Sequence, residues 1–438
     1  MGWVDASSAN ILVRSAAGSP ISLSYWPNST SVTSSIALGL PSVHTDFTLS
    51  AHLPNLHPNT LYLYNTTVGL EGSFVTRRES HKTSKFTLLS TSCQKPNWPY
   101  NPLQHPLAIN GWAHVEKVAA GMSLRPEAML FLGDFIYSDL PYAVAEYTSS
   151  YYRLLYRQIY ASPSWSPFLR SIPWLHMFDD HEIINDYAPS PALSNVFEEA
   201  IEPFLHYQQS VNPPPLVPSQ PTYFSFDLGN VTFFTLDCRS WRSPQPHRRG
   251  DNSTAGYGAR TMLGERQLLE VGKWVERGRE KDMLLVLVSG VPMTRNWALG
   301  RDEMDSWGGY LEEREEILEM LWSSGGAVVI SGDRHEHATT LLPPPASSNH
   351  PYSSSVIEFS TSPLSFFHQP WTREYIPHPP TDITIYHQWK GDSRFGVFEF
   401  NTEGVGKKVT FKLVVDGEYV WVYEWTKGQE VEVVDRGI

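Results

Sequence analysis

The chain has 438 residues, a length that fits one large domain or two to three small ones. Acidic residues outnumber basic ones by 46 to 33, and the net charge of −13 argues against general nucleic-acid binding and against docking on an anionic membrane surface. Two cysteines exclude a disulfide framework, and no apolar run is long enough to span a bilayer. The first ten residues contain neither a basic segment nor an apolar stretch, so we expect no secretory leader and favour an intracellular location.

The first 85 residues are predicted to form a small β-sandwich. Short alternating apolar runs are separated by Ser, Pro, Asn and Gly, which is typical of strands joined by turns. Residues 56–65 (LHPNTLYLYN) predict a turn leading into an edge strand, and they resemble a strand of fibronectin-type-III-like modules. We therefore expect a fibronectin-III-like domain over residues 1–85 and a second domain over 86–438.

From residue 86 onward, short apolar runs alternate with longer amphipathic segments. Strands are expected at residues 86–90, 128–134, 173–180, 231–237, 283–291, 327–333, 355–363 and 395–400. Helices are expected at residues 147–160, 265–279 and 311–322. This alternation predicts an α/β domain of stacked sheets flanked by helices. The segment VVDGEYVW, within the β-rich stretch 409–434, predicts a hairpin with an Asp-Gly turn.

Four polar clusters follow predicted strands, and ligand sites of open α/β folds gather at such strand ends. The clusters are SCQ with Cys93, GDFIY with Asp134 and Tyr137, DDHE at residues 179–182, and GDRHEH with Asp333 and His335. Two cations held about 3.5–4 Å apart need a bridging ligand, which a single carboxylate provides. Hard cations prefer carboxylate oxygens, whereas ferric iron or zinc also accepts thiolate, imidazole or phenolate.

Each cluster alone also has a purely structural interpretation. A Gly-Asp pair after a strand forms an ordinary turn, a lone cysteine is usually a small buried side chain, and Asp-Asp-His-Glu can cap a helix. Their joint occurrence, in order and each at a strand end, favours a shared metal site. His337 lies two residues beyond His335 and is not included in the ligand set, because it could face either direction.

The six motifs SCQ, GDxxY, DDHE with a following Asn, LDxRxxR, DSWxGY and SGDxH resemble, in this order, the PhoD-like alkaline phosphatases. These enzymes are relatives of the purple acid phosphatases within the calcineurin-like metallophosphoesterases. The resemblance covers residues from about 86 to about 400 and implies a sandwich of two mixed β-sheets flanked by helices. The sequence departs from the family pattern at Gly308, where many members have Asp, and at Cys238, where Thr is common.

The resemblance also implies a ligand set for two metals. Cys93, Asp134, Tyr137 and His335 would hold one metal, which is Fe³⁺ in bacterial members. Asp134 would bridge to a second metal, Ca²⁺ in those members, which Asp180 and Asp333 would also bind. Zinc or manganese are the alternatives for metal identity.

Four further residues follow from the same resemblance. His181 would stand beside the leaving group and protonate it, and Asn185 would support this region. Arg239 and Arg242 would face the substrate phosphate, because the planar guanidinium matches phosphate oxygens.

The expected activity is metal-dependent hydrolysis of a small-molecule or lipid phosphate monoester, by attack of a metal-bound hydroxide on phosphorus. One alternative is a phosphodiesterase or phospholipase D-like enzyme acting on phospholipids or nucleotides. A second is a glycoside hydrolase, which needs two carboxylates and no metal. A third is a non-catalytic calcium-binding protein, against which the thiolate of Cys93 argues, since calcium does not need sulfur ligands.

Overall fold

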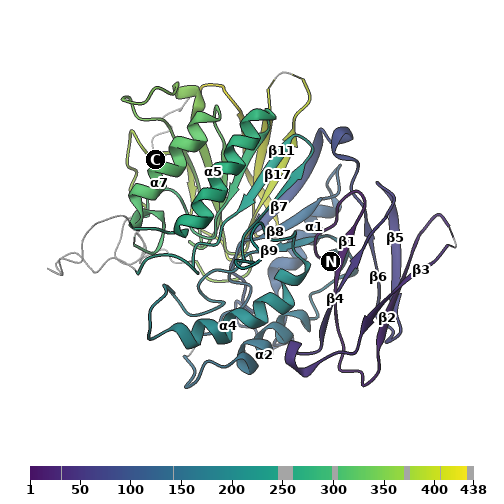
Figure 1. Cartoon of the computed structure of the whole chain (residues 1–438). Coiled ribbons are helices and arrows are strands. Elements are labelled where there is room, and N and C mark those ends of the chain that lie inside the picture. The colour runs from purple at the N-terminus through teal and green to yellow at the C-terminus, as the bar shows by residue number, and fades with distance from the viewer. Residues whose placement is uncertain are drawn as a thin grey trace.

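The computed structural model describes residues 1–30, 32–141, 143–244, 260–297, 304–368, 375–404 and 406–431. Within these ranges, no helix combines the length and the apolar character needed to cross a bilayer. The described residues form a small N-terminal pair of sheets and a large two-sheet sandwich with helices on its outer faces (Figure 1).

The N-terminal part forms two facing sheets, as predicted for a β-sandwich. One sheet pairs β1 (Ala9–Arg14) with β4 (Thr48–Leu53), and the other has the order β3-β2-β5-β6, with strands β2 (Ile21–Pro27), β3 (Ser34–Gly39), β5 (Leu61–Thr66) and β6 (Glu71–Val75). Alternate residues such as Ile11, Val13 and Leu23 are buried between the sheets, because successive side chains of a strand point to opposite faces. The domain boundary at residue 85 stays a prediction.

One expectation for this region is wrong. The stretch 56–65 leads into β5, which pairs with β2 on one side and β6 on the other and is therefore an inner strand, not an edge strand. The turn and the strand are where the sequence placed them. Their position within the sheet depends on partners elsewhere in the chain, which the local pattern does not encode.

Two mixed sheets form the large sandwich. The six-stranded sheet has the order β19-β18-β17-β7-β8-β9, with β7 (Lys85–Thr91), β8 (Ala128–Phe131), β9 (Trp174–His176), β17 (Arg394–Asn401), β18 (Lys408–Val415) and β19 (Glu418–Thr426). The seven-stranded sheet has the order β10-β11-β12-β13-β15-β14-β16, with β10 (Phe224–Leu228), β11 (Val231–Thr235), β12 (Leu284–Val288), β13 (Val328–Ser331), β14 (His337–Leu342), β15 (Val356–Thr361) and β16 (Ile383–Gln388). Strands β7-β8-β9 are mutually parallel, and so are β11-β12-β13-β15.

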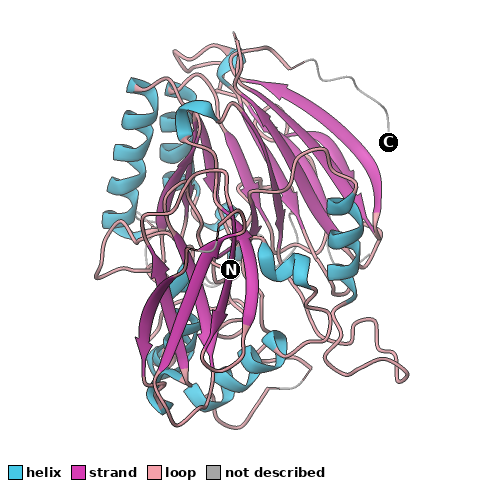
Figure 2. Cartoon of the chain, turned by 90° about the vertical axis from the view of Figure 1, so that its right-hand side faces the viewer, coloured by secondary structure: helices cyan, strands magenta, loops and turns pink. Residues whose placement is uncertain are grey.

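The main apolar core lies between these two sheets, which Figure 2 shows packed face to face. Phe86 of β7 and Phe233 of β11 meet edge to face with ring centroids 6.5 Å apart. Phe359 of β15 and Phe398 of β17 form a second such contact at 5.6 Å. Each fully buried aromatic or aliphatic side chain of this kind stabilises the fold by about 1.5–3 kcal/mol, so this layer fixes how the sheets align.

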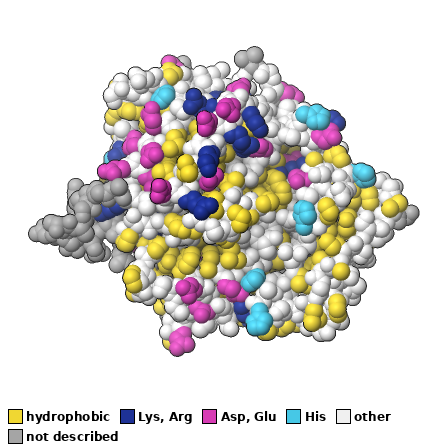
Figure 3. All heavy atoms as spheres, viewed as in Figure 1, with side chains coloured by type: hydrophobic (Ala, Val, Ile, Leu, Met, Phe, Trp, Pro, Cys, Tyr) yellow, Lys and Arg dark blue, Asp and Glu magenta, His cyan; other side chains and the backbone are white. Residues whose placement is uncertain are grey.

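Helices cover both outer faces of the sandwich, as the sequence predicted. The six-stranded sheet shares a core with α1 (Asn110–Ala120), α2 (Ser149–Tyr160), α3 (Pro167–Ser171) and α4 (Ser194–Tyr207). The seven-stranded sheet shares a core with α5 (Gly264–Glu280) and α7 (Leu311–Ser323). The predicted helices at 147–160, 265–279 and 311–322 are confirmed, whereas α1, α3 and α4 were not predicted. Figure 3 shows acidic and basic side chains interspersed on the face where α5 and α7 lie.

Short 3₁₀ helices complete the described elements: η1 (Val43–Thr45), η2 (Ser80–Lys82), η3 (Gln209–Val211), η4 (Trp307–Gly309) and η5 (Tyr352–Ser354). The predicted Asp-Gly hairpin joins β18 to β19, with Asp416 and Gly417 at φ values of 48° and 83°. Two consecutive residues with positive φ match the right-handed twist of the flanking strands. This hairpin confirms the strand-rich end of the chain over the described residues.

Candidate active site

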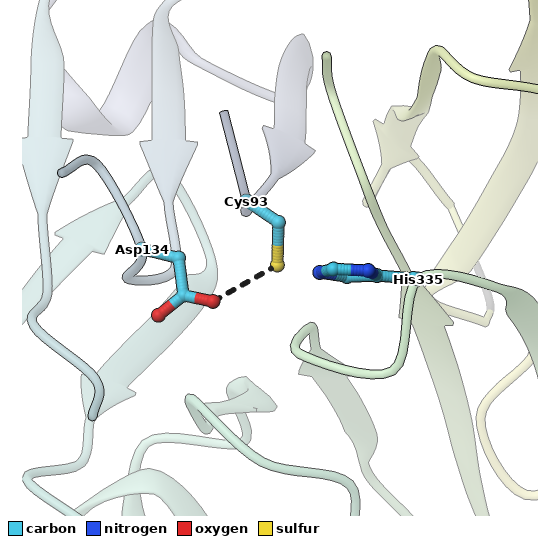
Figure 4. Close-up of side chains that lie close together, drawn as sticks. All are labelled: Cys93, Asp134 and His335. Carbon is cyan, nitrogen blue, oxygen red and sulfur yellow. Dashed lines mark hydrogen bonds between the residues drawn. The ribbon is translucent and has the colours of Figure 1, made fainter. Parts of the chain in front are cut away.

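Three predicted ligands meet where strands of both sheets end. Cys93 follows β7, Asp134 follows β8 and His335 follows β13, and all three are buried. Figure 4 shows the Cys93 sulfur between the Asp134 carboxylate and the His335 ring. The Sγ atom lies 3.3 Å from Asp134 Oδ2. One ligand atom of each residue lies within 4.8 Å of the others, which is close enough to share one cation.

Tyr137 joins the same cluster. Its hydroxyl lies 3.0 Å from Asp134 Oδ2 and 3.2 Å from His335 Nε2. The ring packs against Phe366, whose centroid is 4.5 Å away, and Phe366 also contacts the His335 ring. The structure therefore brings together all four side chains predicted to hold the first metal.

A second cluster adjoins the first. Asp179, Asp180 and Asp333 place carboxylate oxygens within 4.8 Å of one another, and the carboxylates of Asp134 and Asp180 lie within the same distance of a ring nitrogen of His181. Asp134 thus contributes to groups on both sides of the site, which is the position a bridging carboxylate needs. Of the members of this cluster, Asp179 was predicted only as part of the DDHE motif.

The backbone of four ligand-type residues is left-handed. Cys93, Asp134, Asp333 and His335 have φ values of 60°, 55°, 74° and 56°. An L-residue in this region costs about 1–3 kcal/mol and persists only where its surroundings fix it, which occurs mostly at functional sites. Four such residues converging from three strand ends are the strongest geometric sign of function in the described chain.

Two glycines permit the close approach of the strand ends. A Cβ atom on Gly133, which has a φ of 106°, would lie 2.4 Å from the Cβ of Asp179. A Cβ atom on Gly332 would lie 2.4 Å from Ser92 Oγ. The Gly-Asp pairs are therefore needed for two contacts: one between the loops after β8 and β9, and one between the two sheets.

The donor atoms fit cations. Asp134 Oδ1 and Asp179 Oδ2 are buried and accept no hydrogen bond from the part of the chain that the structure describes. Burial raises the pKa of the Cys93 thiol well above its ordinary value, and the charge of Asp134 raises it further. A bound cation has the opposite effect and lowers the pKa of these groups, because it stabilises both thiolate and carboxylate. Thiol, phenol, imidazole and carboxyl groups in one buried cluster match a site for two cations.

Arg239 lies inside the carboxylate cluster. Its side chain is fully buried, its Nε pairs with Asp179 Oδ1, and its Nη1 donates to Asp305 Oδ1 over 2.8 Å. Its Nη2 lies 3.4 Å from Asp180 Oδ1 and makes no hydrogen bond within the described residues. Arg239 is thus at the site, and its contact with a phosphate stays a prediction.

Arg242 lies beside Arg239 and shares its partner. The Nη2 of Arg242 donates to Asp305 Oδ1 over 2.7 Å, and its side chain is also fully buried. Although burial alone would raise the pKa of Asp305, Arg239 and Arg242 lower it below its ordinary value. Asp305 therefore fixes both guanidinium groups in place.

His181 is oriented by Asp139, whose role was not predicted from the sequence. Its Nδ1 lies 2.6 Å from Asp139 Oδ1. Burial lowers the pKa of His181, but Asp180, Asp134 and Asp139 outweigh burial and raise it to about 10. The backbone N–H of Asn185 donates to Asp139 Oδ2 over 2.7 Å, while the Asn185 side chain is exposed. Asn185 thus contacts Asp139 through its backbone N–H, and a supporting role for its side chain stays a prediction.

The roles of Asp139, Asp179, Asp305 and Glu182 were not predicted from the sequence. Asp179 and Glu182 belong to the DDHE motif, and Asp305 begins the DSW motif, so short motifs marked three of them. Asp139 follows GDFIY by two residues and carried no signal of its own. His337, excluded from the ligand set, lies on β14 with its ring nitrogens beside Thr361 and Thr339.

Two solved structures share the fold of this chain. A solved structure of PhoD matches with a TM-score of 0.70 at 18% identity, over 97% of this chain and 89% of that one. A purple acid phosphatase from yellow lupin (Lupinus luteus) seeds matches with a TM-score of 0.64 at 13% identity, over 97% of this chain and 73% of that one. Both share a sandwich of mixed sheets with flanking helices, which confirms the predicted fold class.

The sequence comparison defines the family. Residues 88–375 match the model of the PhoD-like phosphatases, and the chain belongs to this family. It is 24% identical to alkaline phosphatase D of Bacillus subtilis (strain 168) in an alignment of 321 residues that covers 64% of this chain. The aligned region is 52% of that relative, so the chain spans about half the length of the curated protein it matches.

Proposed function

We propose that this protein is a metal-dependent phosphomonoesterase, similar to alkaline phosphatase D. The observation that carries the proposal is the convergence of Cys93, Asp134, Asp333 and His335, all with left-handed backbone, at strand ends of both sheets. Membership of the PhoD-like phosphatase family supports the same reaction class, phosphoric ester hydrolysis.

Two cations complete the proposed site. Cys93, Asp134, Tyr137 and His335 hold the first, and their thiolate and phenolate favour Fe³⁺. Asp134, Asp180 and Asp333 belong to the carboxylate-rich half, which favours a hard cation such as Ca²⁺. When bound, the metals activate water and stabilise charge on the phosphoryl oxygens.

The chain's own groups supply a donor to the phosphate and a proton to the leaving group. Arg239 Nη2, which makes no hydrogen bond among the described residues, has donor capacity for a phosphoryl oxygen. His181, held by Asp139 through Nδ1, has Nε2 available to protonate the departing alkoxide. Asp305 prevents Arg239 and Arg242 from rotating away, so no reorganisation is needed as charge develops.

The charge balance favours a monoester dianion over a diester. Without cations the carboxylates outnumber the arginines and repel phosphate, whereas bound cations make the local electrostatic potential positive. Arg239 and Arg242 then add positive charge beside the metals, which stabilises a dianion more than a monoanion. A phosphodiesterase remains the alternative within the same reaction class.

The test compares two substrates on the purified full chain. We expect turnover of para-nitrophenyl phosphate to exceed that of bis(para-nitrophenyl) phosphate, to stop in a chelator and to return when metal is restored. Elemental analysis should find two cations per chain. Faster hydrolysis of the diester would replace the proposal with the phosphodiesterase, and full activity in the chelator would remove the metals from the mechanism.

A further inference from the structure

Glu182 is the last residue of the DDHE motif and has no assigned role in the proposed reaction. It is 1% exposed, so its carboxylate is out of contact with bulk water. A buried carboxylate is costly unless several donors satisfy it, so its partners show what it does. All of the partners described here are backbone amides.

The carboxylate of Glu182 accepts hydrogen bonds from four backbone N–H groups. Its Oε2 accepts from Asp134 over 2.9 Å and from Asp179 over 2.8 Å. Its Oε1 accepts from Phe135 over 2.5 Å, and Ile136 N lies 3.4 Å from the same oxygen. Hydrogen bonds to an ionised acceptor are about twice as strong as neutral ones. One side chain thus joins the loop after β8 to the loop after β9.

These two loops carry the central ligands of the proposed site. The loop after β8 supplies Asp134 and Tyr137, and the loop after β9 supplies Asp180 and His181. Asp134 has a left-handed backbone with a φ of 55°, which its neighbours must maintain. The Asp134 amide is one of the four that Glu182 binds, so the Glu182 contact acts on the strained residue itself.

The geometry points to Glu182 as a positioning residue that sets the spacing between the two metal-binding loops. It touches neither metal nor substrate and acts through the backbone of Asp134 and Asp179. This inference rests on the proposed function, because it assumes that Asp134 and Asp180 bind metal. Metal affinity then depends on Glu182 beyond any effect of this residue on the stability of the fold.

Glu182→Gln is the informative change. Each carboxylate oxygen faces two backbone N–H groups, so the amide nitrogen of Gln would oppose two donors in either orientation. Glu182→Asp keeps the charge and both acceptors but is shorter by one methylene. It serves as the second variant and decides the question where Glu182→Gln does not fold.

Glu313 offers a matched control. It is also buried, lies in the first turn of α7 and accepts from the backbone N–H groups of Met262 and Leu263 over 3.2 and 2.9 Å. Its described contacts include none of the predicted metal ligands. Glu313→Gln, like Glu182→Gln, therefore removes the charge of a buried carboxylate that accepts from backbone N–H groups. It changes neither of the two metal-binding loops.

The experiment uses the full chain stripped of metal with EDTA and titrated with Co²⁺ alone, followed by thiolate-to-cobalt absorption. The thermal midpoint of each stripped protein is measured in parallel. We expect Glu182→Gln to raise the Kd for Co²⁺ about 10–100-fold, as loss of an outer-shell partner does elsewhere. Glu182→Asp should raise Kd less, and Glu313→Gln should lower the midpoint while leaving Kd unchanged.

The outcomes separate this inference from the proposed function. Suppose that the wild type binds Co²⁺ and hydrolyses a phosphate ester. If Glu182→Gln then binds Co²⁺ equally well, the role of Glu182 is overturned and the function stands. Where Glu182→Gln does not fold, the same result in Glu182→Asp leads to the same conclusion. An equal rise in Kd in Glu313→Gln would likewise overturn it, because the effect would then be one of general stability. A wild-type protein that neither binds Co²⁺ nor hydrolyses phosphate esters would overturn the function and the inference together.

Discussion

Asp139 Oδ1 lies 2.6 Å from His181 Nδ1, although the two residues are 42 positions apart in the chain. This contact fixes the orientation of the imidazole and leaves Nε2 as the nitrogen available to a substrate. The second carboxylate oxygen of Asp139 accepts the Asn185 amide, so Asp139 is itself held in place. Asp139 gives the proposed proton donor a defined direction, and its charge adds to those of Asp180 and Asp134 in raising the pKa of His181.

Asp139→Asn should lower kcat for a phosphate monoester by about 100-fold, within the range general acid catalysis contributes. The neutral amide removes a charge that raises the pKa of His181, so the pKa falls. A general acid loses activity above its pKa, and the alkaline limb of the kcat profile should therefore shift to lower pH. Asn185→Ala is the control, since only the Asn185 backbone contacts Asp139. An unchanged pH profile in Asp139→Asn would exclude His181 as the acid.

Asp134→Asn should abolish turnover and lower the content of both metals while the fold is kept. Asparagine is neutral and offers one oxygen, so it cannot bridge two cations as a carboxylate can. Asp134 Oδ1 accepts no hydrogen bond within the described residues, which leaves this atom available for a metal. Activity assays and elemental analysis check the expectation. Asp227→Asn, at a partly exposed ion pair with Arg277, is the control. Near-normal activity of Asp134→Asn would refute a shared ligand.

Arg239→Lys should raise KM for a monoester and weaken inhibition by inorganic phosphate. Lysine keeps the charge but loses the planar set of donors that reaches Asp179, Asp305 and the phosphate position together. The expected loss is about 2–4 kcal/mol of phosphate binding, on the scale of buried charge-pair truncations. Titration with inorganic phosphate measures it directly. Unchanged phosphate inhibition would show that Arg239 serves only to balance the carboxylates.

Cys93→Ser should lower iron content and weaken visible charge-transfer absorption, whereas Cys238→Ser should change neither. Both thiols are buried, so the two substitutions have comparable effects on packing. Cys93 Sγ lies 3.3 Å from Asp134 Oδ2, while Cys238 Sγ lies 3.5 Å from Ser289 Oγ, away from the predicted ligands. Iron per chain in the two serine variants is the measurement. Equal iron in both would remove Cys93 from the ligand set.

Local patterns in the sequence were sufficient for most strands of the large sandwich, three helices and the strand-end motifs, but they did not predict β10, β14 or β16. Alternation and helical spacing are properties of neighbouring residues, so FTLLS, AMLFL and AVVIS predicted β7, β8 and β13 without knowledge of their partners. Because each motif follows its strand directly, Cys93, Asp134 and His335 were predicted to meet, and they do. The fold class followed from the same alternation.

Contacts between distant segments were decided only by the tertiary structure. Asp139 meets His181 across 42 residues, and Arg239 meets Asp305 across 66, because the two sheets bring separate loops to one end of the sandwich. Pairing with β2 and β6 made β5 an inner strand of the N-terminal sheet, and the packing of the loops buried both arginines among carboxylates. A residue's type and its neighbours in the chain specify which chemistry it can perform. The partner that orients a side chain depends on tertiary packing, because the core between the two sheets decides which strand ends lie next to one another.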